Sequence, residues 1–390
     1  GLPVQDEPGE VCGGTFALDD TAGEYVTIVV ADYAGNETTY KVKYGGTPED
    51  FTGRMFGFTS GTSRGEGQRW VEINPATLSK TTGMEDIESV NYEVYAAEYV
   101  AKRVFFATED GIYTAPQDDL NSVQKVTDYS AFDASVGEMV ADMAFNTKDK
   151  TMYVLTNNIS DISRGTINSD ATGNKLYTLD LVTGEMVKVA DITVDHPTSD
   201  SASYLALRTL AIDDNGNFYA ANSGSGRTVF LFKWTLEDMA GGTMEVKAVN
   251  ESQNLIDSGL YLTSYASMAY DHDKGILYLT GSYGTKSSND VDNELWVIDP
   301  VAATGAHPNT ENDAQFSDHV VGLYVVPSST ITLPKTAGVS TVELNKTELT
   351  VLEGTTITLE ASVYPWLVED KSVTWSTSDP ETVSVENDGT

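Results

Sequence analysis

The chain has 390 residues and a formal net charge of −36, with 59 acidic residues against 23 lysines and arginines. Nucleic acids and acidic membrane surfaces are therefore poor partners, because binding to phosphate groups needs a basic surface. The length predicts two or three domains, and a hydrophobic content of 40% is enough to fill their cores.

The single cysteine, Cys12, excludes an intrachain disulfide but leaves secretion open. No apolar run approaches the roughly 20 residues of a membrane-spanning helix, so we predict no membrane insertion. No signal peptide opens the chain. The first residues, Gly1–Asp6, look like a cut made inside a longer protein.

Residues 1–48 predict the final strands of a β-sandwich. Tyr25–Ala31 is rich in β-branched residues, Asp32–Asn36 contains the Gly and Asn of a turn, and Tyr40–Tyr44 alternates apolar with polar residues. This arrangement resembles the last hairpin of bacterial immunoglobulin-like and fibronectin-like modules. Two or three strands are too few for a stable sandwich, so we expect the rest of this module upstream.

Residues 49–328 contain a pattern that recurs about every fifty residues: an apolar strand, a tight polar turn, a second strand and an aromatic third strand. Three units show it most clearly, at Met143–Asn146, Met152–Leu155 and Leu176–Asp180; at Leu210–Asp213, Phe218–Ala220 and Val229–Phe232; and at Met268–Asp271, Ile276–Leu279 and Leu295–Asp299. Such repeats predict an all-β fold, a β-propeller. We count five blades, with six as the alternative.

The first unit of the propeller lacks its opening strand. A spare strand, Val320–Pro327, lies at the far end of the repeat region. Without a shared strand the first and last blades would meet with an open strand edge and no main-chain link. We therefore predict that the chain around Leu323 pairs with Arg54–Phe58 and closes the ring.

Aromatic residues recur in the third strand of each unit: Trp70, Tyr113, Tyr177, Phe232 and Trp296. They could form a stacking platform for a ligand. Aromatic side chains more often fill cores and interfaces, so we expect them to pack one blade against the next.

Two segments of the repeat region, Leu176–Gly184 and Trp296–Gly305, resemble propeller segments of very large surface proteins of Gram-positive gut bacteria. Some of those proteins carry a subtilisin-like serine protease domain. The resemblance implies an extracellular location and allows a role as an accessory region of such a protease. No subtilisin-type Ser, His and Asp context occurs in this chain.

Residues 329–339 predict a linker, and residues 340–390 carry a set of motifs at Leu344–Leu349, Gly354, Val363–Pro365, Lys371–Asp379 and Val383–Val385. Together these motifs resemble a group 2 bacterial immunoglobulin-like domain. The resemblance implies a sandwich with Trp375 at its buried centre. Such domains continue with two or three more strands, so we expect the domain to be truncated as given.

Three short motifs suggest chemistry without the context that it needs. Gly61–Gly65 fits a Gly-x-Ser-x-Gly nucleophile elbow, but no helical pattern follows it. Asp213–Asn217 resembles the start of a calcium loop but lacks the closing glutamate, so a turn is the simpler interpretation. The four histidines are scattered, without zinc-site spacing, and His272 is expected to be a solvated turn residue. We predict no catalytic residue, no metal ligand and no cofactor, with calcium possible on so acidic a surface.

Connections between second and third strands are long and polar in four units, at Thr59–Arg69, Thr156–Asn174, Asn222–Arg227 and Gly281–Asn293. In a propeller they emerge on one face, together with the links between blades. Insertions on one face often mark the binding face, although surface loops also tolerate insertions without function. The candidate binding residues on this face are Arg64, Arg69, Asp161, Arg164, Asp170, Arg227, Tyr265, Tyr283, Asp290 and Asp292.

The leading hypothesis is a monomeric, non-catalytic, extracellular or cell-wall-associated region of a bacterial surface protein. Its propeller would bind an extracellular glycan or protein, and its immunoglobulin-like modules would act as spacers. A rival hypothesis is a propeller glycosidase or lyase with a carboxylate pair in the central funnel, about 5–10 Å apart and with one raised pKa. A third is a purely structural stalk.

Overall fold

The structure, a computed structural model, describes residues 24–31, 37–44, 50–60, 68–133, 137–158, 173–197, 205–222, 229–256, 262, 266–284, 291–309, 314–329, 341–344, 350, 356–359, 361–364, 372–379 and 382–384. The chain divides into two compact units, Gly1–Phe51 and Thr52–Thr390. Apart from one 3₁₀ turn, η4 (Glu237–Met239), the described elements are β-strands. None of the described residues forms a helix with the length and apolar character needed to cross a membrane.

The first unit contains one antiparallel hairpin, formed by β1 (Glu24–Ala31) and β2 (Glu37–Tyr44). The predicted strand pair is therefore present. Its membership of an immunoglobulin-like or fibronectin-like module stays a prediction, as do the predicted domain boundaries.

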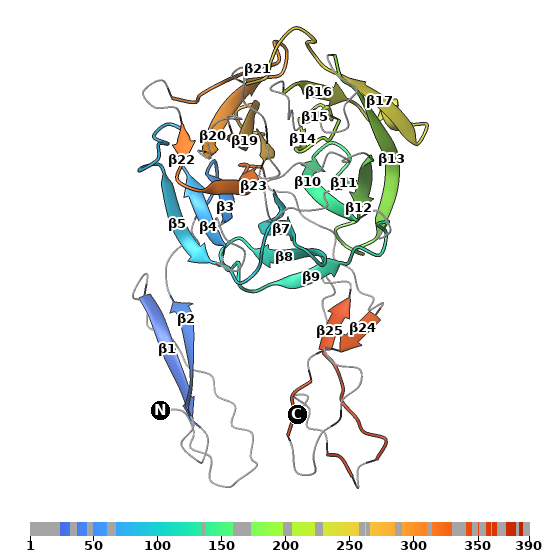
Figure 1. The fold of residues 1–390 in the computed structure, drawn as a ribbon. Coiled ribbons are helices and arrows are strands. Elements are labelled where there is room, and N and C mark those ends of the chain that lie inside the picture. The colour runs from blue at the N-terminus through green and yellow to red at the C-terminus, as the bar shows by residue number, and fades with distance from the viewer. Residues whose placement is uncertain are drawn as a thin grey trace. The chain divides into compact units, whose positions relative to one another are not determined.

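The second unit contains five sheets arranged radially around a central axis (Figure 1). We call each sheet a blade and name its strands from the axis outward: blade 1 has β23 (His319–Val325), β3 (Met55–Ser60), β4 (Arg69–Ile73) and β5 (Met84–Ser89), and blade 2 has β6 (Ala96–Val100), β7 (Arg103–Ala107), β8 (Ile112–Pro116) and β9 (Gln124–Thr127). Blade 3 has β10 (Glu138–Asn146), β11 (Thr151–Asn158), β12 (Asn174–Leu179) and β13 (Met186–Asp195), and blade 4 has β14 (Ala211–Ile212), β15 (Phe218–Ala221) and β16 (Leu231–Trp234). Blade 5 has β18 (Ser267–Asp271), β19 (Ile276–Gly284), β20 (Val291–Asp299) and β21 (Thr304–Ala306), and β22 (Gln315–Phe316) also pairs with β20. The fold is the predicted five-bladed β-propeller.

The ring closes as predicted. β23 pairs antiparallel with β3, so that Tyr324 lies opposite Phe56. The register shifts between Val321 and Tyr324, and Gly322 within this shift has φ +56°. A Cβ at Gly322 would lie 2.9 Å from the Cβ of Ala97 in β6. Glycine is therefore required both by the backbone conformation and by the close approach of blade 2.

Aromatic side chains of the third strands fill the interfaces between blades. Trp70, Tyr177, Phe232 and Trp296 are each at most 3% exposed. The last three belong to separate apolar clusters between successive blades. The packing role between blades is confirmed for Tyr177, Phe232 and Trp296, whereas Trp70 is buried against Phe56 and Tyr324 of its own blade and Tyr113 is only half-buried.

Blades 3 and 4 share a strand that the sequence analysis did not predict. β17 (Thr243–Lys247) runs parallel to β13, and Ala248 directly after it bridges to Phe232 in β16. Met244 and Val246 are buried in the cluster between the two blades. One strand therefore covers the outer edge of blade 3 and continues along blade 4, which leaves no long open edge there.

The tight turns between first and second strands lie at one end of the ring, which we call the turn end. Asn146, Asp213 and Asp271 end or follow the first strand of blades 3, 4 and 5, and each accepts a main-chain N–H of its own turn with a side-chain oxygen. Such local hydrogen bonds favour turns. Asp213 also accepts the N–H of Asn217 at 2.9 Å. Asp213–Asn217 therefore forms a turn, which was the simpler interpretation of this segment.

His272 is not the solvated turn residue that the sequence predicted. Its Nδ1 lies 2.7 Å from Oδ1 of Asp214, and its side chain is 15% exposed. The same Asp214 oxygen accepts the hydroxyl of Thr147 at 3.2 Å. The turns of blades 3, 4 and 5 are thus tied to one another.

In the C-terminal segment, β24 (Thr341–Leu344) pairs antiparallel with β25 (Ala361–Tyr364). Ile357 and Leu359 are half-buried beside the exposed Thr356 and Thr358. Trp375, expected to be the buried centre, is only half-buried. The physical reason is that one two-stranded sheet cannot cover a large side chain from both sides.

Candidate functional site

The end of the ring opposite the turns, where second strands lead into third strands, is the loop end. Between β7 and β8 of blade 2 this connection is the short turn Thr108–Gly111, closed by a 2.9 Å hydrogen bond from the Thr108 N–H to the Gly111 carbonyl. The other four blades carry longer connections. Blade 2 is therefore the one blade whose loop end is not extended by an insertion.

The candidate residues Arg64, Asp161, Arg164, Asp170, Arg227, Tyr265 and Asp290 lie outside the described residues. Arg69 opens β4, and its guanidinium contacts Asp86 at 2.6 Å and also Asp318. Two carboxylates therefore already neutralise this arginine.

Tyr283 and Asp292 are register partners in β19 and β20. The predicted connection Gly281–Asn293 is thus too long, because the antiparallel ladder continues to Gly284 and Val291. The connection 285–290 remains between the two strands.

The nucleophile-elbow motif, Gly61–Gly65, also lies outside the described residues. Its flanking elements, β3 and β4, are antiparallel strands of one sheet. The strand-to-helix turn that the motif requires is not formed by these flanks.

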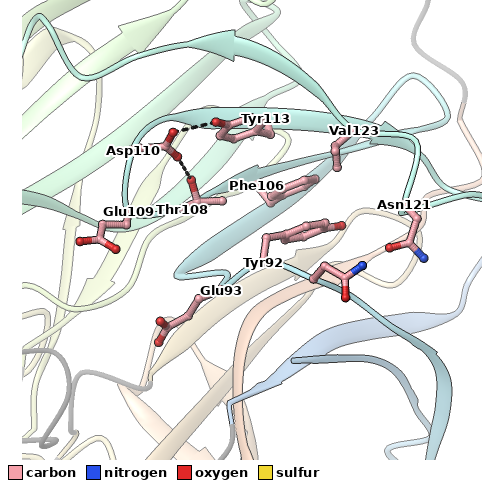
Figure 2. A pocket seen from close by; sticks show the side chains of 10 residues that line it. Tyr92, Glu93, Phe106, Thr108, Glu109, Asp110, Tyr113, Asn121 and Val123 are labelled. Atoms are coloured by element: carbon pink, nitrogen blue, oxygen red, sulfur yellow. Dashed lines mark hydrogen bonds between the residues drawn. The ribbon is translucent and has the colours of Figure 1, made fainter. Parts of the chain in front are cut away.

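A cleft of about 530 Å³ opens beside the short β7–β8 turn. Its walls come from the link between blades 1 and 2, from the β7–β8 turn and from the connection that precedes β9 (Figure 2). The lining residues are Asn91, Tyr92, Glu93, Phe106, Thr108, Glu109, Asp110, Tyr113, Asn121 and Val123. This volume lies within the range of small-molecule sites.

Three aromatic rings form a column along one wall of the cleft (Figure 2). The ring of Phe106 lies 4.5 Å from that of Tyr92 and 6.1 Å from that of Tyr113, and both pairs are stacked. The hydroxyl of Tyr92 donates to the carbonyl of Leu120 at 2.6 Å, and that of Tyr113 donates to Asp110 at 2.9 Å. Both tyrosines are therefore held in place before any ligand arrives.

The polar lining of the cleft is acidic. Glu93, Glu109 and Asp110 are exposed, and no lysine or arginine is among the lining residues. Burial acts to raise the pKa of Asp110, but hydrogen bonds from Thr108 and Tyr113 and the charge of Lys125 hold it below its ordinary value. The cleft therefore offers ionised acceptors beside an aromatic wall.

Sequence reasoning missed this cleft because it searched the long connections. The available signal was the opposite one: among the five blades, blade 2 alone joins its second and third strands by a short turn, Thr108–Gly111. A missing insertion leaves the side chains beneath it open to a ligand.

A buried carboxylate, Asp142, lies on the innermost strand of blade 3 at a register shift after Val140. It accepts the N–H of Leu210 at 2.9 Å and that of Met268 at 3.1 Å. These residues belong to the inner chain of blades 4 and 5. Burial raises the pKa of Asp142, the main-chain hydrogen bonds oppose the rise, and the charge of Glu98 adds to it.

Glu98 plays a similar part on the innermost strand of blade 2. It accepts the N–H of Tyr99 at 2.7 Å and that of Phe145 in blade 3 at 3.3 Å. Burial raises the pKa of Glu98 to about 7, against the effects of the Tyr99 N–H and the charge of His272. Glu98 and Asp142 thus have raised pKa values, as the enzyme hypothesis requires of at least one carboxylate. Their oxygens, however, are turned to main-chain donors and hold the blades together.

Within the described ranges, no group of three or more His, Cys, Asp or Glu side chains is arranged to hold a metal ion. Residues 338–390 match the bacterial Ig-like domain (group 2) family, which confirms the resemblance of the C-terminal segment. A search of curated proteins gives no match.

Several solved structures are similar to the chain at low identity. TolB from Acinetobacter baumannii shares 12% identity over 80% of this chain and 81% of that chain, with a TM-score of 0.37. An exo-β-1,3-galactanase from Phanerochaete chrysosporium shares 12% identity over 73% and 66% of the two chains, with a TM-score of 0.35. Apo AztD from Citrobacter koseri shares 9% identity over 69% and 58%, with a TM-score of 0.28. The fold assignment rests on the strand pairing of the chain itself.

Proposed function

We propose that the propeller is a non-catalytic binding module and that its ligand is a neutral glycan held in the cleft of blade 2. The observation that carries the proposal is the fixed aromatic column beside acidic and amide side chains. Sugar rings offer apolar C–H faces to aromatic rings and hydroxyl donors to carboxylates. A cleft of about 530 Å³ is large enough for a short oligosaccharide.

In this proposal the chain is a monomeric region of an extracellular or cell-wall-associated bacterial protein. The bacterial Ig-like domain at residues 338–390 supports that location and acts as a spacer. The long connections, with the candidate residues predicted on them, form the rim of the binding face. An accessory role beside a subtilisin-like protease rests on the sequence resemblance alone.

The test is an array of neutral oligosaccharides, followed by titration of the tightest one against variants. Tyr92→Ala removes one end of the aromatic column and is expected to weaken binding at least tenfold, which is about 1.4 kcal/mol. The matched control is Tyr270→Ala, a half-buried tyrosine of blade 5 whose ring packs on His272. Equal affinities of the two variants would contradict the proposal.

A positively charged protein segment is the rival occupant, because an acidic aromatic cleft also attracts cations. The two are separated by salt. Binding of a neutral glycan is expected to change little between about 50 and 500 mM salt. Binding of a basic peptide is expected to weaken strongly over the same range.

A further inference from the structure

Arg208 stands apart among the arginines that the structure describes. It is 2% exposed, and its side chain donates from Nη1 to Oδ1 of Asn157 at 3.3 Å. Its Nε and Nη2 are buried and have no hydrogen-bond partner among the residues that the structure describes. Burial lowers the pKa of Arg208 to about 10, so the guanidinium remains charged at neutral pH. A buried charge without a counter-ion is unfavourable.

Arg54 shows how the Nε–Nη2 edge of a guanidinium is paired elsewhere in the same protein. Its Nε donates to Oε1 of Glu72 at 2.8 Å, and its Nη2 donates to Oε2. Nε–H and Nη2–H point in parallel and match the two oxygens of one carboxylate. In Arg208 the same two groups face no carboxylate of the described ranges.

The backbone that carries Arg208 is fixed by neighbouring side chains. Oδ1 of Asn174 accepts the N–H of Leu207 at 2.9 Å, and Nδ2 of Asn157 donates to the Leu207 carbonyl at 2.6 Å. The N–H of Arg208 itself donates to the Ala221 carbonyl at 2.8 Å. Arg208 is thereby held at the loop end of the innermost chain of blade 4, where that chain approaches β14.

We propose that Arg208 anchors a buried site for the carboxylate of a small ligand, bound side-on by Nε and Nη2. The site lies on blade 4 and is separate from the cleft of blade 2, so it goes beyond the proposed glycan function. One carboxylate fits this edge, whereas polyanions are repelled by a net charge of −36. A small organic acid and an acidic sugar share the required chemistry.

The test measures thermal stability and binding of the whole chain with acetate, glucuronate or glucose at constant ionic strength. A carboxylate ligand at about a hundred times its Kd is expected to raise the Tm by roughly 2–5 °C, and glucose is expected to leave it unchanged. A larger shift with acetate than with glucuronate identifies a small acid, and the reverse identifies an acidic sugar. Equal shifts with glucose and glucuronate, or no shift with either acid, would overturn the proposal.

Two variants locate the site. Arg208→Lys keeps the charge but loses the two-pronged edge, and it is expected to weaken carboxylate binding at least tenfold. Arg54→Gln breaks the pair with Glu72 and is expected to keep the full response to the ligand. If Arg208→Lys binds as the wild type does, the site is not there. Binding of a neutral oligosaccharide in the cleft is expected to survive Arg208→Lys, so this proposal and the glycan function can fail separately.

A crystal structure of the wild-type chain with glucuronate or acetate decides the question if the Arg208 variant does not fold. Carboxylate oxygens within about 3 Å of both Nε and Nη2 support the site. An Nε–Nη2 edge without a carboxylate in a crystal saturated with the ligand overturns it.

Discussion

The two ends of the propeller use their polar side chains in different ways. At the turn end, Asp213 and Asp271 accept main-chain N–H groups of their own turns, and Asp214 accepts donors from two neighbouring blades. At the loop end, within the part that the structure describes, the acids of the cleft face solvent and Arg208 keeps buried donors without a partner. The turn end is therefore built for stability, and the loop end keeps polar groups for a ligand.

The largest effect is expected on the axis between the two ends. Asp142→Ala removes the acceptor that joins the inner chains of blades 3, 4 and 5 and leaves buried N–H groups of Leu210 and Met268 unpaired. We expect a loss of about 3–4 kcal/mol in the free energy of unfolding, measured by denaturant titration. Asp142→Asn keeps one acceptor oxygen and is expected to lose less. A value for Asp142→Ala within about 0.5 kcal/mol of the wild type would contradict this role.

Closure of the ring gives the next largest effect. Gly322→Ala places a Cβ 2.9 Å from the Cβ of Ala97, at φ +56°, and is expected to cost about 2–3 kcal/mol. Gly241→Ala is the matched control, because its nearest contact is 3.9 Å away. Thermal unfolding of both variants checks the difference. Equal Tm values would mean that the closing strand is not held as tightly as the register indicates.

The pH dependence of stability tests Glu98. Its folded pKa is about 7, against an ordinary value of 4.5, so the folded state keeps a proton that the unfolded state has lost between these pH values. The contribution of Glu98 to stability therefore decreases as the pH rises from about 4.5 to 7 and is constant above that range. Glu98→Gln, which cannot titrate, is expected to gain about 3 kcal/mol relative to the wild type across this window. Parallel pH profiles of the two proteins would show that Glu98 titrates normally.

At the turn end the expected effect is smaller. Asp213→Ala removes the acceptor for Asn215 and Asn217 and is expected to cost about 1–2 kcal/mol while oligosaccharide binding stays unchanged. Glu109→Gln in the cleft is expected to weaken oligosaccharide binding. Because Glu109 is exposed, the free energy of unfolding is expected to stay unchanged. Denaturant titration and calorimetry on both variants measure the contrast. Weaker oligosaccharide binding by Asp213→Ala would contradict the claim that the turn end serves stability and the loop end serves binding.

The blades and their closure could be predicted because they depend on local alternation. The repeat of apolar strand, turn and aromatic strand is visible in single segments. The first blade lacked an opening strand, so the spare strand around Leu323 was expected to fill that place beside β3. β17 carried the same alternation, with Met244 and Val246 buried. Its parallel partner β13 is about fifty residues away, and no local pattern specifies such a pairing.

The polar sites could not be predicted for a different reason. Asp142 is a single acid in an apolar run, and its three-blade role appears only when the register shift at Val140 places it between inner strands. Packing decides whether an arginine is exposed, paired with an acid or buried without a partner. The sequence therefore does not distinguish Arg208 from Arg69. The cleft was hidden because it arises from a connection that is short.

The claim that the loop end of blade 2 binds the ligand is tested most directly by two exposed valines. Val123 lies in the cleft and is 41% exposed, and Val187 lies on β13 and is 50% exposed. Neither Val123→Asn nor Val187→Asn is expected to change the fold. Calorimetric titration with the tightest oligosaccharide is predicted to show at least fivefold weaker binding for Val123→Asn and wild-type binding for Val187→Asn. Equal affinities for the two variants would place the ligand elsewhere.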